Sequence, residues 1–243
     1  MGYTGIMQVP SSHPILGKRL LIITAHPDDE SYVMAGTLAA NAKAGGQNLL
    51  VCGTKGEQGV SHVRLPMTSH ELAACRCKEL EHAAKILRVT KLVTWNFPDG
   101  QLQKHAVAFG KKLFTLAKTF QPEVVVSFGP CGITGHHDHV AAGEVGRKLA
   151  KKLQLPFAAA VLPPRVQRNA KAFLYARRKS PNYARTIHFL QPNLTIPINA
   201  VVKRRAVCCH KSQMDGRAAF TGFPAYVVTA LLAKEYFRIW SPK

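Results

Sequence analysis

The stretch LLIITAHPDDE, residues 20–30, joins an apolar run to a histidine, a proline and three consecutive acids. An apolar run of this kind belongs in a protein core, whereas acids usually lie in water. Pro27 prevents a central strand from continuing. The stretch therefore predicts a buried strand that ends near His26, with Asp28, Asp29 and Glu30 at the start of a helix, where carboxylates are tolerated. Alone, it leaves open whether these acids only cap that helix or form a site.

Outward from this stretch, β-rich apolar runs alternate with longer helical patterns. Strands are expected over residues 19–25, 48–54, 91–97, 123–128 and 156–162. Helices are expected over residues 31–44, 70–87, 101–120, 140–153, 201–214 and 225–240, with extended chain over 186–200. Strands that are apolar throughout are buried on both faces, and βαβ alternation favours parallel pairing. The expected fold class is α/β: a doubly wound, mostly parallel, Rossmann-like sheet in three α/β/α layers.

The whole chain, residues 1–243, is expected to form a single domain, because no linker, repeat or low-complexity tract divides it. Residues 19–162 would form the βαβ core. The segment PPRVQRNAKAFLYARRKS, residues 163–180, breaks the rhythm and is expected to be an exposed basic excursion.

The charge of the chain is strongly positive and uneven. Lys and Arg number 33 against 13 Asp and Glu, a net +20. Residues 1–100 hold 10 basic and 8 acidic side chains, which leaves 23 and 5, or +18, for residues 101–243. Such a half predicts an anionic partner, namely nucleic acid, a lipid surface or a substrate with phosphate or carboxylate groups, or else a basic surface kept for solubility.

Cysteine usage and hydropathy limit the class of protein further. None of the six cysteines forms a Cys-x-x-Cys pair, so buried free thiols in a reducing compartment are favoured over disulfides or a zinc ribbon. No apolar run approaches the ~18 residues of a membrane helix, and the N-terminus has no signal-peptide pattern. A cytoplasmic location is expected.

A second polar cluster follows another expected strand. GPCGITGHHDHV, residues 129–140, comes directly after VVVSF and contains His136, His137, Asp138 and His139. Functional groups of an open α/β sheet collect beyond the carboxyl ends of its strands, so both clusters should meet there. Catalytic zinc commonly uses three imidazole or carboxylate ligands. Either cluster alone has a structural explanation, but the two together predict a metal site.

AHPDDE after a strand and the later His-x-Asp-His together resemble the PIG-L or LmbE-like family of zinc-dependent N-acetylglucosaminyl de-N-acetylases. Supporting matches are TKGEQG at 54–59, CRCKELEHAAKIL at 75–87, NFPDG at 96–100 and HKSQ at 210–213. The resemblance covers about residues 19–213. It implies an LmbE-like hydrolase that removes acetyl from an N-acetylglucosamine-type conjugate, with residues 163–243 shaping the substrate pocket.

The resemblance also implies residue roles at the metal. His26, Asp29 and His139 would bind Zn²⁺, or another divalent transition metal such as Fe²⁺. Asp28 would be the general base, taking a proton from a metal-activated water and returning it to the leaving amine.

Further roles follow from the same resemblance. His136 would stabilise the tetrahedral intermediate, and Asp138 would orient and charge His136. Arg76, Asp99 and Glu57 would contact the substrate. Each has an alternative: Arg76 as an i,i+3 ion pair with Glu79, Asp99 as a turn residue, and Glu57 as a loop hydrogen-bond acceptor.

Two histidines leave further alternatives open. His137 stands where the family usually has proline, and it would be either exposed, which we favour, or a competing ligand. His210 would cap the pocket or lie on a surface helix.

Other functions remain to be weighed against the deacetylase. The alternatives are an amidase for another small amide or antibiotic, and a basic protein that binds nucleic acid or an anionic surface. The expected partner is an amino-sugar conjugate, whose basic surroundings suggest an anionic aglycone. Nucleic acid is not favoured, because no known nucleic-acid-binding module is evident. Similar proteins often form homo-oligomers, and those that act on lipids carry a membrane helix, so this chain resembles the soluble prokaryotic branch.

Overall fold

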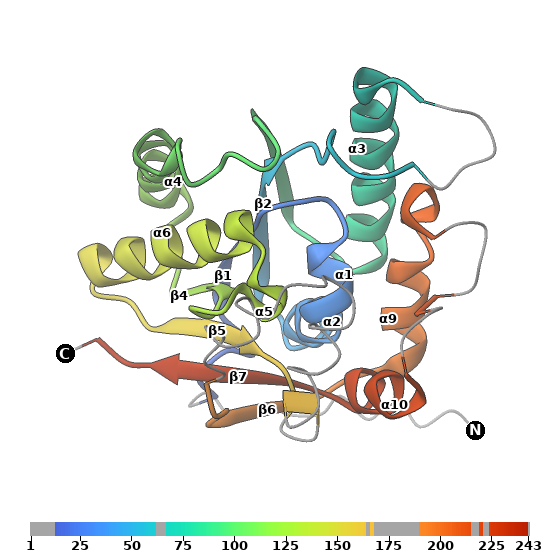
Figure 1. Cartoon of the computed structure of the whole chain (residues 1–243). Helices are drawn as coiled ribbons and strands as arrows, with labels where there is room; N and C mark the ends of the chain where they lie inside the picture. The colour runs from blue at the N-terminus through green and yellow to red at the C-terminus, as the bar shows by residue number, and fades with distance from the viewer. Residues whose placement is uncertain are drawn as a thin grey trace.

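The computed structural model describes residues 13–61, 67–163, 166–167, 190–214, 219–220 and 224–242. Their seven strands form one sheet in the order β3-β2-β1-β4-β5-β7-β6 (Figure 1). The strands are β1 (Arg19–Thr24), β2 (Gln47–Thr54), β3 (Lys91–Phe97), β4 (Val124–Phe128), β5 (Phe157–Val161), β6 (Leu194–Pro197) and β7 (Lys234–Trp240). The first five are parallel, and β7 runs antiparallel to both β5 and β6. The predicted doubly wound, mostly parallel sheet is confirmed.

Helices cover both faces of this sheet (Figure 1). They are α1 (Asp29–Val33), α2 (Ala35–Lys43), α3 (Ser69–Ile86), α4 (Ala106–Phe120), α5 (Gly132–Gly135), α6 (His137–Leu153), α9 (Ala200–Val207) and α10 (Ala225–Ala233), with a 3-10 turn at Lys211–Gln213. Helix α6 packs on β4 and β1 and contacts α4, while α2 and α3 pack on β2 and β3 and contact α9. The three-layer α/β/α architecture follows from these contacts.

The topology places the ends of β1 and β4 side by side. Leu21 pairs with Val125 in parallel register, and both residues are fully buried. The chain leaves β1 toward β2 on one side and returns as β4 on the other, so the order of the strands reverses between them. A crevice forms outside the carboxyl ends of strands at such a switch point. The two His/Asp clusters therefore lie in one place.

Close packing fixes α6 over this crevice. A Cβ added to Gly143 would lie 2.4 Å from the carbonyl oxygen of Phe128, so only glycine lets α6 approach β4 this closely. The ring of Phe128 is 1% exposed and stacks on the ring of His139 at a centroid distance of 4.4 Å. Helix position and ring position are thus set together.

Element boundaries differ from the expectations in four places, one of which is the helix expected over 201–214, since α9 ends at Val207 and a 3-10 turn follows at Lys211–Gln213. The helix expected over 31–44 breaks at Met34 into α1 and α2, and the one expected over 101–120 begins only at Ala106. The helix expected over 225–240 is wrong in its second half, because KEYFRIW forms β7. The aromatic and branched side chains of this segment favour a strand, and pairing with β5 and β6 satisfies its backbone groups. The expected basic excursion lies outside the described residues, apart from residues 163, 166 and 167.

Among the described residues, no helix combines the length and the apolar character needed to cross a bilayer.

Candidate metal centre and active site

The turn after β1 directs Asp29 back over the end of the strand. Its Oδ2 accepts hydrogen bonds from the backbone N–H groups of Ala25 (3.0 Å) and His26 (2.8 Å). Its Oδ1 then faces Nε2 of His139 at 3.0 Å. Burial opposes the charge of this carboxylate, but the facing rings of His139 and His26 hold the pKa of Asp29 below its usual range.

The first turn of α6 carries His139 to the same point. Its Nδ1 lies 3.0 Å from the carbonyl oxygen of Gly132, and its ring stacks on Phe128. Gly132 has φ of +55°, and an added Cβ would come within 2.9 Å of the Cβ of His139, so the loop needs glycine here. The remaining nitrogen of His139, Nε2, lies 3.3 Å from Nδ1 of His26.

Two carboxylates hold the other side of the His26 ring. Nε2 of His26 lies 2.9 Å from Oδ1 of Asp99 and 3.3 Å from Oδ2 of Asp138. Burial opposes protonation of this ring, but the hydrogen bonds to Asp138 and Asp99 and the charge of Asp29 raise the pKa of His26 to about 10. Backbone N–H groups of Gly100 (2.7 Å) and Leu102 (2.9 Å) donate to Asp138 and keep it in place.

The hydrogen bonds of the two rings indicate what lies between them. When both rings are neutral, His139 donates from Nδ1 to a carbonyl and His26 donates from Nε2 to carboxylates, so that Nε2 of His139 and Nδ1 of His26 each keep a lone pair. Facing nitrogens 3.3 Å apart are held together by a shared proton, which the raised pKa of His26 supplies, or by a metal ion in its place.

The spacing of the candidate ligand atoms fits a divalent metal. Around a tetrahedral zinc with bonds of about 2.0–2.1 Å, neighbouring ligand atoms lie about 3.3 Å apart. Nε2 of His139 lies 3.3 Å from Nδ1 of His26 and 3.0 Å from Oδ1 of Asp29. The other oxygen of Asp29, Oδ2, lies 3.9 Å from Nδ1 of His26. Two other sets could also hold a metal, because their ligand atoms lie within 4.8 Å of one another: His26 with His136 and His139, and His26 with Asp99 and Asp138.

Asp28 lies beside this cluster in an unusual backbone conformation. Its φ is 109° and its ψ is −27°, a left-handed conformation that residues other than glycine rarely adopt. Its N–H donates to Oε2 of Glu30 at 3.1 Å, and its carboxylate contacts the guanidinium of Arg76 at 3.2 Å. Burial raises the pKa of Asp28, against the opposing charge of Arg76. A raised pKa suits a carboxylate that must accept a proton near neutral pH.

Arg76 supports this carboxylate from behind. It is 4% exposed, and it donates to the carbonyl oxygens of Pro27 and, at 2.9 Å, of Gly56. The alternative pairing with Glu79 is not what forms, since Glu79 accepts from the N–H and hydroxyl of Ser212, both at 2.7 Å. Arg76 therefore faces the candidate base, and it has little surface left for the predicted substrate contact.

The other two predicted substrate residues also have partners within the protein. Oε1 of Glu57 accepts from the N–H of Asp99 at 2.8 Å, and Oδ2 of Asp99 accepts from the N–H of Gln58 at 3.0 Å. The loops after β2 and β3 are tied together in this way. Glu57 follows the loop-acceptor alternative, and Asp99 contacts a candidate metal ligand, His26, rather than open space.

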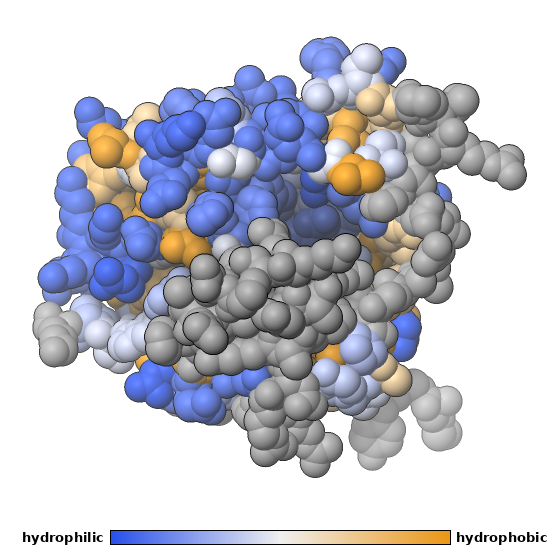
Figure 2. All heavy atoms as spheres, in the orientation of Figure 1, coloured by the Kyte–Doolittle hydropathy of each residue, from blue (hydrophilic) through white to orange (hydrophobic). Residues whose placement is uncertain are grey.

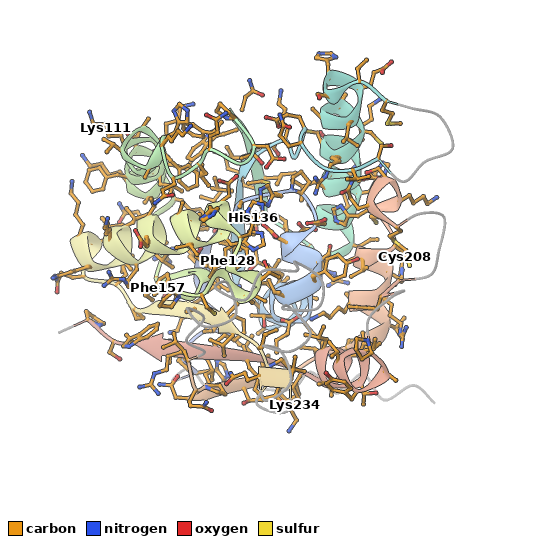
Figure 3. The ribbon with its side chains drawn as sticks, viewed as in Figure 1. Lys111, Phe128, His136, Phe157, Cys208 and Lys234 are labelled. Carbon is orange, nitrogen blue, oxygen red and sulfur yellow. The ribbon has the colours of Figure 1, made fainter. Side chains whose placement is uncertain are left out.

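His136 caps α6 and is oriented by the backbone. Its Nδ1 accepts from the N–H of Asp138 at 3.3 Å, which places the proton of the neutral ring on Nε2. Burial and the neighbouring rings of His26 and His139 lower the pKa of His136 to about 4, so the ring is neutral at pH 7. The ring of His136, labelled in Figure 3, lies edge-on to that of His26 at a centroid distance of 4.7 Å.

The structure differs from the expectation for Asp138 and agrees with that for His137. The carboxylate of Asp138 was expected to orient His136, but it contacts His26, because the N–H groups of Gly100 and Leu102 fix it on that side. His137 is exposed, as favoured.

Glu30 and His210 form a buried pair behind Asp28. The sequence predicted no role in the site for Glu30 and either a pocket cap or a surface position for His210. Oε1 of Glu30 lies 2.8 Å from Nε2 of His210, and both side chains are fully buried. The alternative that His210 lies on a surface helix is therefore wrong. The third acid of HPDDE was the available signal for Glu30, since a buried acid needs a partner.

A small cavity of about 240 Å³ opens beside the cluster. Asp28, Asp29 and His139 line one side of it. The other walls are mostly apolar and include Ile133 and, from α10, Val227. Such a cavity suits a small group, such as an acetyl, held against the polar cluster.

Comparison with known proteins identifies the family. The PIG-L family, described as GlcNAc-PI de-N-acetylase, matches residues 21–150. A 1D-myo-inositol 2-acetamido-2-deoxy-alpha-D-glucopyranoside deacetylase of Nakamurella multipartita is 30% identical over 91% of this chain and 88% of its own length. A "Probable N-acetyl-alpha-D-glucosaminyl L-malate deacetylase 2" of Bacillus anthracis is 35% identical over 52% of this chain, and the match spans only 57% of that protein.

Solved structures show the same fold. N,N'-diacetylchitobiose deacetylase from Pyrococcus horikoshii aligns with a TM-score of 0.64 at 24% identity, over 92% of this chain and 84% of its own. GalB, a 4-carboxy-2-hydroxymuconate hydratase from Pseudomonas putida, aligns with the same TM-score at 17% identity, over 93% and 96%. The fold therefore accommodates more than one reaction, and it is the sequence match that shows the family. On that match, this chain belongs to the PIG-L family of GlcNAc-PI de-N-acetylases.

Proposed function

We propose that this protein is a metal-dependent N-deacetylase that hydrolyses the acetamide of an N-acetylglucosamine-type conjugate to acetate and a free amine. The observation that carries the proposal is the pair of facing ring nitrogens of His26 and His139, 3.3 Å apart, with the carboxylate of Asp29 against them and that of Asp28 beside them. A cation at this point and a base next to it are the requirements of metal-assisted amide hydrolysis.

His26, Asp29 and His139 would hold the metal, and their nitrogen and oxygen donors suit Zn²⁺. When bound, zinc would polarise the acetamide carbonyl and lower the pKa of a water to about 7. Asp99 and Asp138 fix the ring of His26 so that Nδ1 faces the site. Carboxylates in such positions keep a ligand histidine in one tautomer.

Asp28 would take a proton from the attacking water and deliver it to the leaving nitrogen. Its held backbone and the guanidinium of Arg76 keep the carboxylate in one orientation. Neutral His136 would donate its Nε2–H to the carbonyl oxygen as negative charge develops there. The two residues thus perform opposite tasks, for which their pKa values are shifted in opposite directions from their usual ranges.

We propose that the substrate is an N-acetylglucosamine conjugate with an anionic aglycone. Relatives are named for GlcNAc-inositol, GlcNAc-malate and diacetylchitobiose substrates. The +18 charge of residues 101–243 favours an anionic aglycone. The alternative to an N-acetylglucosamine deacetylase is an amidase that acts on another small amide. We also predict that the chain forms a homo-oligomer.

Metal analysis combined with an amine-release assay tests the proposal. The purified protein is loaded with zinc and incubated with GlcNAc-malate, GlcNAc-inositol and diacetylchitobiose. We expect about one metal per chain and amine release from at least one substrate. Asp28→Asn should keep the metal but lose a factor of about 10²–10⁴ in kcat, the usual contribution of a general base.

His137→Gln is the matched control, because it changes an exposed histidine inside the same motif and should leave both readouts unchanged. Full activity of the Asp28→Asn protein would refute the assignment of the base. Failure to bind zinc would refute the metal centre. Release of amine only from amides without a sugar would support the alternative amidase.

A further inference from the structure

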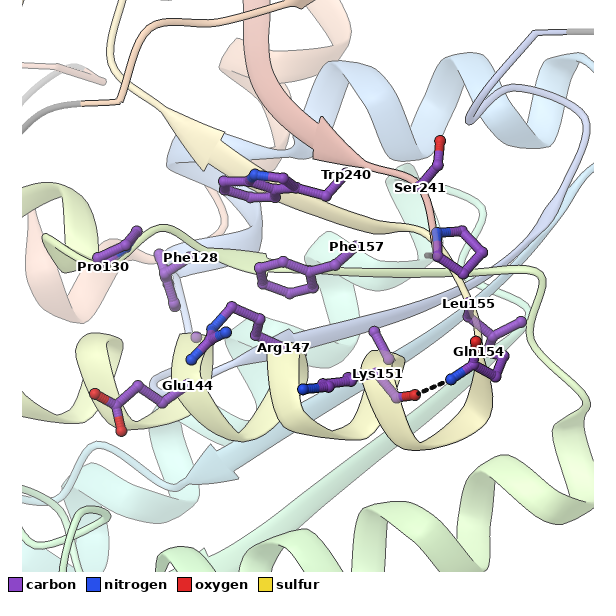
Figure 4. Close-up of a pocket in the computed structure, with 13 residues that line it drawn as sticks. Phe128, Pro130, Glu144, Arg147, Lys151, Gln154, Leu155, Phe157, Trp240 and Ser241 are labelled. Carbon is purple, nitrogen blue, oxygen red and sulfur yellow. Dashed lines mark hydrogen bonds between the residues drawn. The ribbon is translucent and has the colours of Figure 1, made fainter.

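A second and larger cavity lies on the other side of Phe128 from the candidate metal centre. It has a volume of about 610 Å³ and runs between α6 and the ends of β5 and β7 (Figure 4). Phe128 lines both cavities and separates them. Small-molecule sites usually measure about 300–1,000 Å³, so this groove has the size of a ligand site. The proposed deacetylation assigns it no role.

Two aromatic rings form a flat wall of this groove. Phe157 of β5 and Trp240 of β7 are paired across the two strands and stack at a centroid distance of 5.9 Å and an interplanar angle of 16°. Phe157 is 4% exposed, whereas Trp240 is 37% exposed, an unusual fraction for so large an apolar ring. One face of Trp240 stacks on Phe157 and the guanidinium of Arg238 lies 6.0 Å from the ring centroid, so the exposed remainder of the ring is the surface on which another flat group can stack.

Two cations project from α6 beside these rings. Arg147 and Lys151 are four residues apart on one face of the helix, and both line the groove (Figure 4). In the part of the chain that the structure describes, neither side chain has an ion pair or hydrogen bond, whereas Lys148 pairs with Glu144 at 4.0 Å. Like charges at i,i+4 repel each other. The helix dipole stabilises cations only in the last turn of a helix, and Arg147 lies before the last turn of α6. The dipole therefore does not explain why a cation stands at position 147.

The surrounding surface adds more positive charge. Lys148 and Lys152 flank the pair on α6, and α4 carries Lys111, Lys112 and Lys118. Figure 2 shows hydrophilic residues gathered over α4 and α6. Glu144 is the one acidic side chain among the lining residues of the groove, so positive charge exceeds negative there and raises the local concentration of anions.

We propose that this groove binds a small anion that carries a flat ring, of the nucleotide type. The ring stacks against Trp240, and Arg147 and Lys151 bind the phosphate. Arginine suits phosphate because its planar donors match the oxygens in pairs, and lysine adds a point charge. The site is separate from the metal centre and does not depend on the proposed deacetylase activity.

Trp240 itself reports binding, because the chain has only two tryptophans. In a Trp95→Phe protein, whose fold is checked by circular dichroism, Trp240 is the sole tryptophan fluorophore. The probes are adenosine 5′-monophosphate, adenosine and inorganic phosphate, which carry ring and anion, ring alone and anion alone. We expect the monophosphate to quench the fluorescence and to bind at least tenfold more tightly than either fragment, with an affinity that falls as salt rises.

Charge-removing variants test the two cations, with calorimetry on the otherwise unchanged chain. Arg147→Gln combined with Lys151→Gln should weaken the monophosphate at least tenfold and leave zinc content unchanged. Lys78→Gln, an exposed lysine on α3, is the matched control and should bind as the parent does.

Three outcomes would overturn the proposal. They are equal affinity for adenosine and its monophosphate, unchanged binding in the Arg147/Lys151 double variant, and no response to any probe. A single-stranded oligonucleotide that binds far more tightly than the monophosphate would also overturn it, since the groove would then be part of a nucleic-acid track.

Discussion

The buried pair of Glu30 and His210 offers a direct test of how the site is supported. Its atoms are 2.8 Å apart and both side chains are fully buried. At an effective dielectric constant of about 20, two unit charges at this distance attract by about 6 kcal/mol before desolvation is subtracted. Removing one partner of a buried pair typically costs about 3–5 kcal/mol.

His210→Gln removes the charge but keeps a hydrogen-bond donor, so we expect a loss at the lower end, about 3 kcal/mol in the free energy of unfolding. Unfolding entropy of about 2.1 cal/mol/K per residue over 243 residues is about 0.5 kcal/mol/K. The melting temperature should therefore fall by about 6 °C.

The loss should depend on pH with a defined sign. Burial opposes protonation of His210, but the facing Glu30 raises its pKa above the usual value of 6.5. A raised pKa in the folded state stabilises the protein fully below pH 6.5, and this contribution disappears as pH rises through the folded pKa. The deficit of His210→Gln should therefore be largest near pH 6 and should shrink at higher pH, because Glu30 then loses its charged partner in the parent as well.

Thermal unfolding followed by circular dichroism between pH 5 and 9 measures this deficit, with the metal removed from both proteins. His82→Gln, an exposed histidine on α3, is the control and should follow the parent at every pH. A deficit that stays constant, or that grows as pH rises, would refute the charged pair.

Three further predictions concern the metal centre and its support. Zinc must displace the proton held on His26, whose pKa is about 10, so zinc affinity should rise about tenfold per pH unit between pH 6 and 8. Calorimetry in two buffers with different ionisation enthalpies measures this change. An affinity independent of pH would contradict the prediction. Gly143→Ala should cost about 1–3 kcal/mol in the free energy of urea unfolding, because its Cβ would meet the carbonyl oxygen of Phe128 at 2.4 Å. Gly110→Ala in α4, whose Cβ would lie 3.5 Å from the nearest side-chain atom, should be neutral or stabilising. Equal effects of the two substitutions would refute the close approach of α6. Arg76→Lys should lower kcat far more than it raises KM, since the single ammonium nitrogen of lysine cannot replace the two guanidinium nitrogens that contact Gly56, Pro27 and the candidate base. A change confined to KM would indicate a substrate contact instead.

The sequence alone determined the parallel core and the chemistry collected at its edge. Strand β3 spans Lys91–Phe97 as expected, and the apolar run of β4 is buried throughout. Such strands can be predicted from the sequence, because the hydrophobic period and the composition of a run depend only on residues that are neighbours in the chain. The same locality brought HPDDE and His-x-Asp-His to strand ends, and the topology of a parallel sheet then brings those ends together.

Only the tertiary structure decided which group faces which. The aromatic and branched residues of β7 favour a strand, but only the fold decides that this strand joins β5 and β6. Asp138 orients His26 rather than His136 because two N–H groups from the loop after β3 hold its carboxylate. Glu30 meets His210 across 180 residues of sequence. Residue types fix what chemistry is available, but the direction of a carboxylate depends on backbone donors that lie far away in the chain and reach it only when the chain has folded.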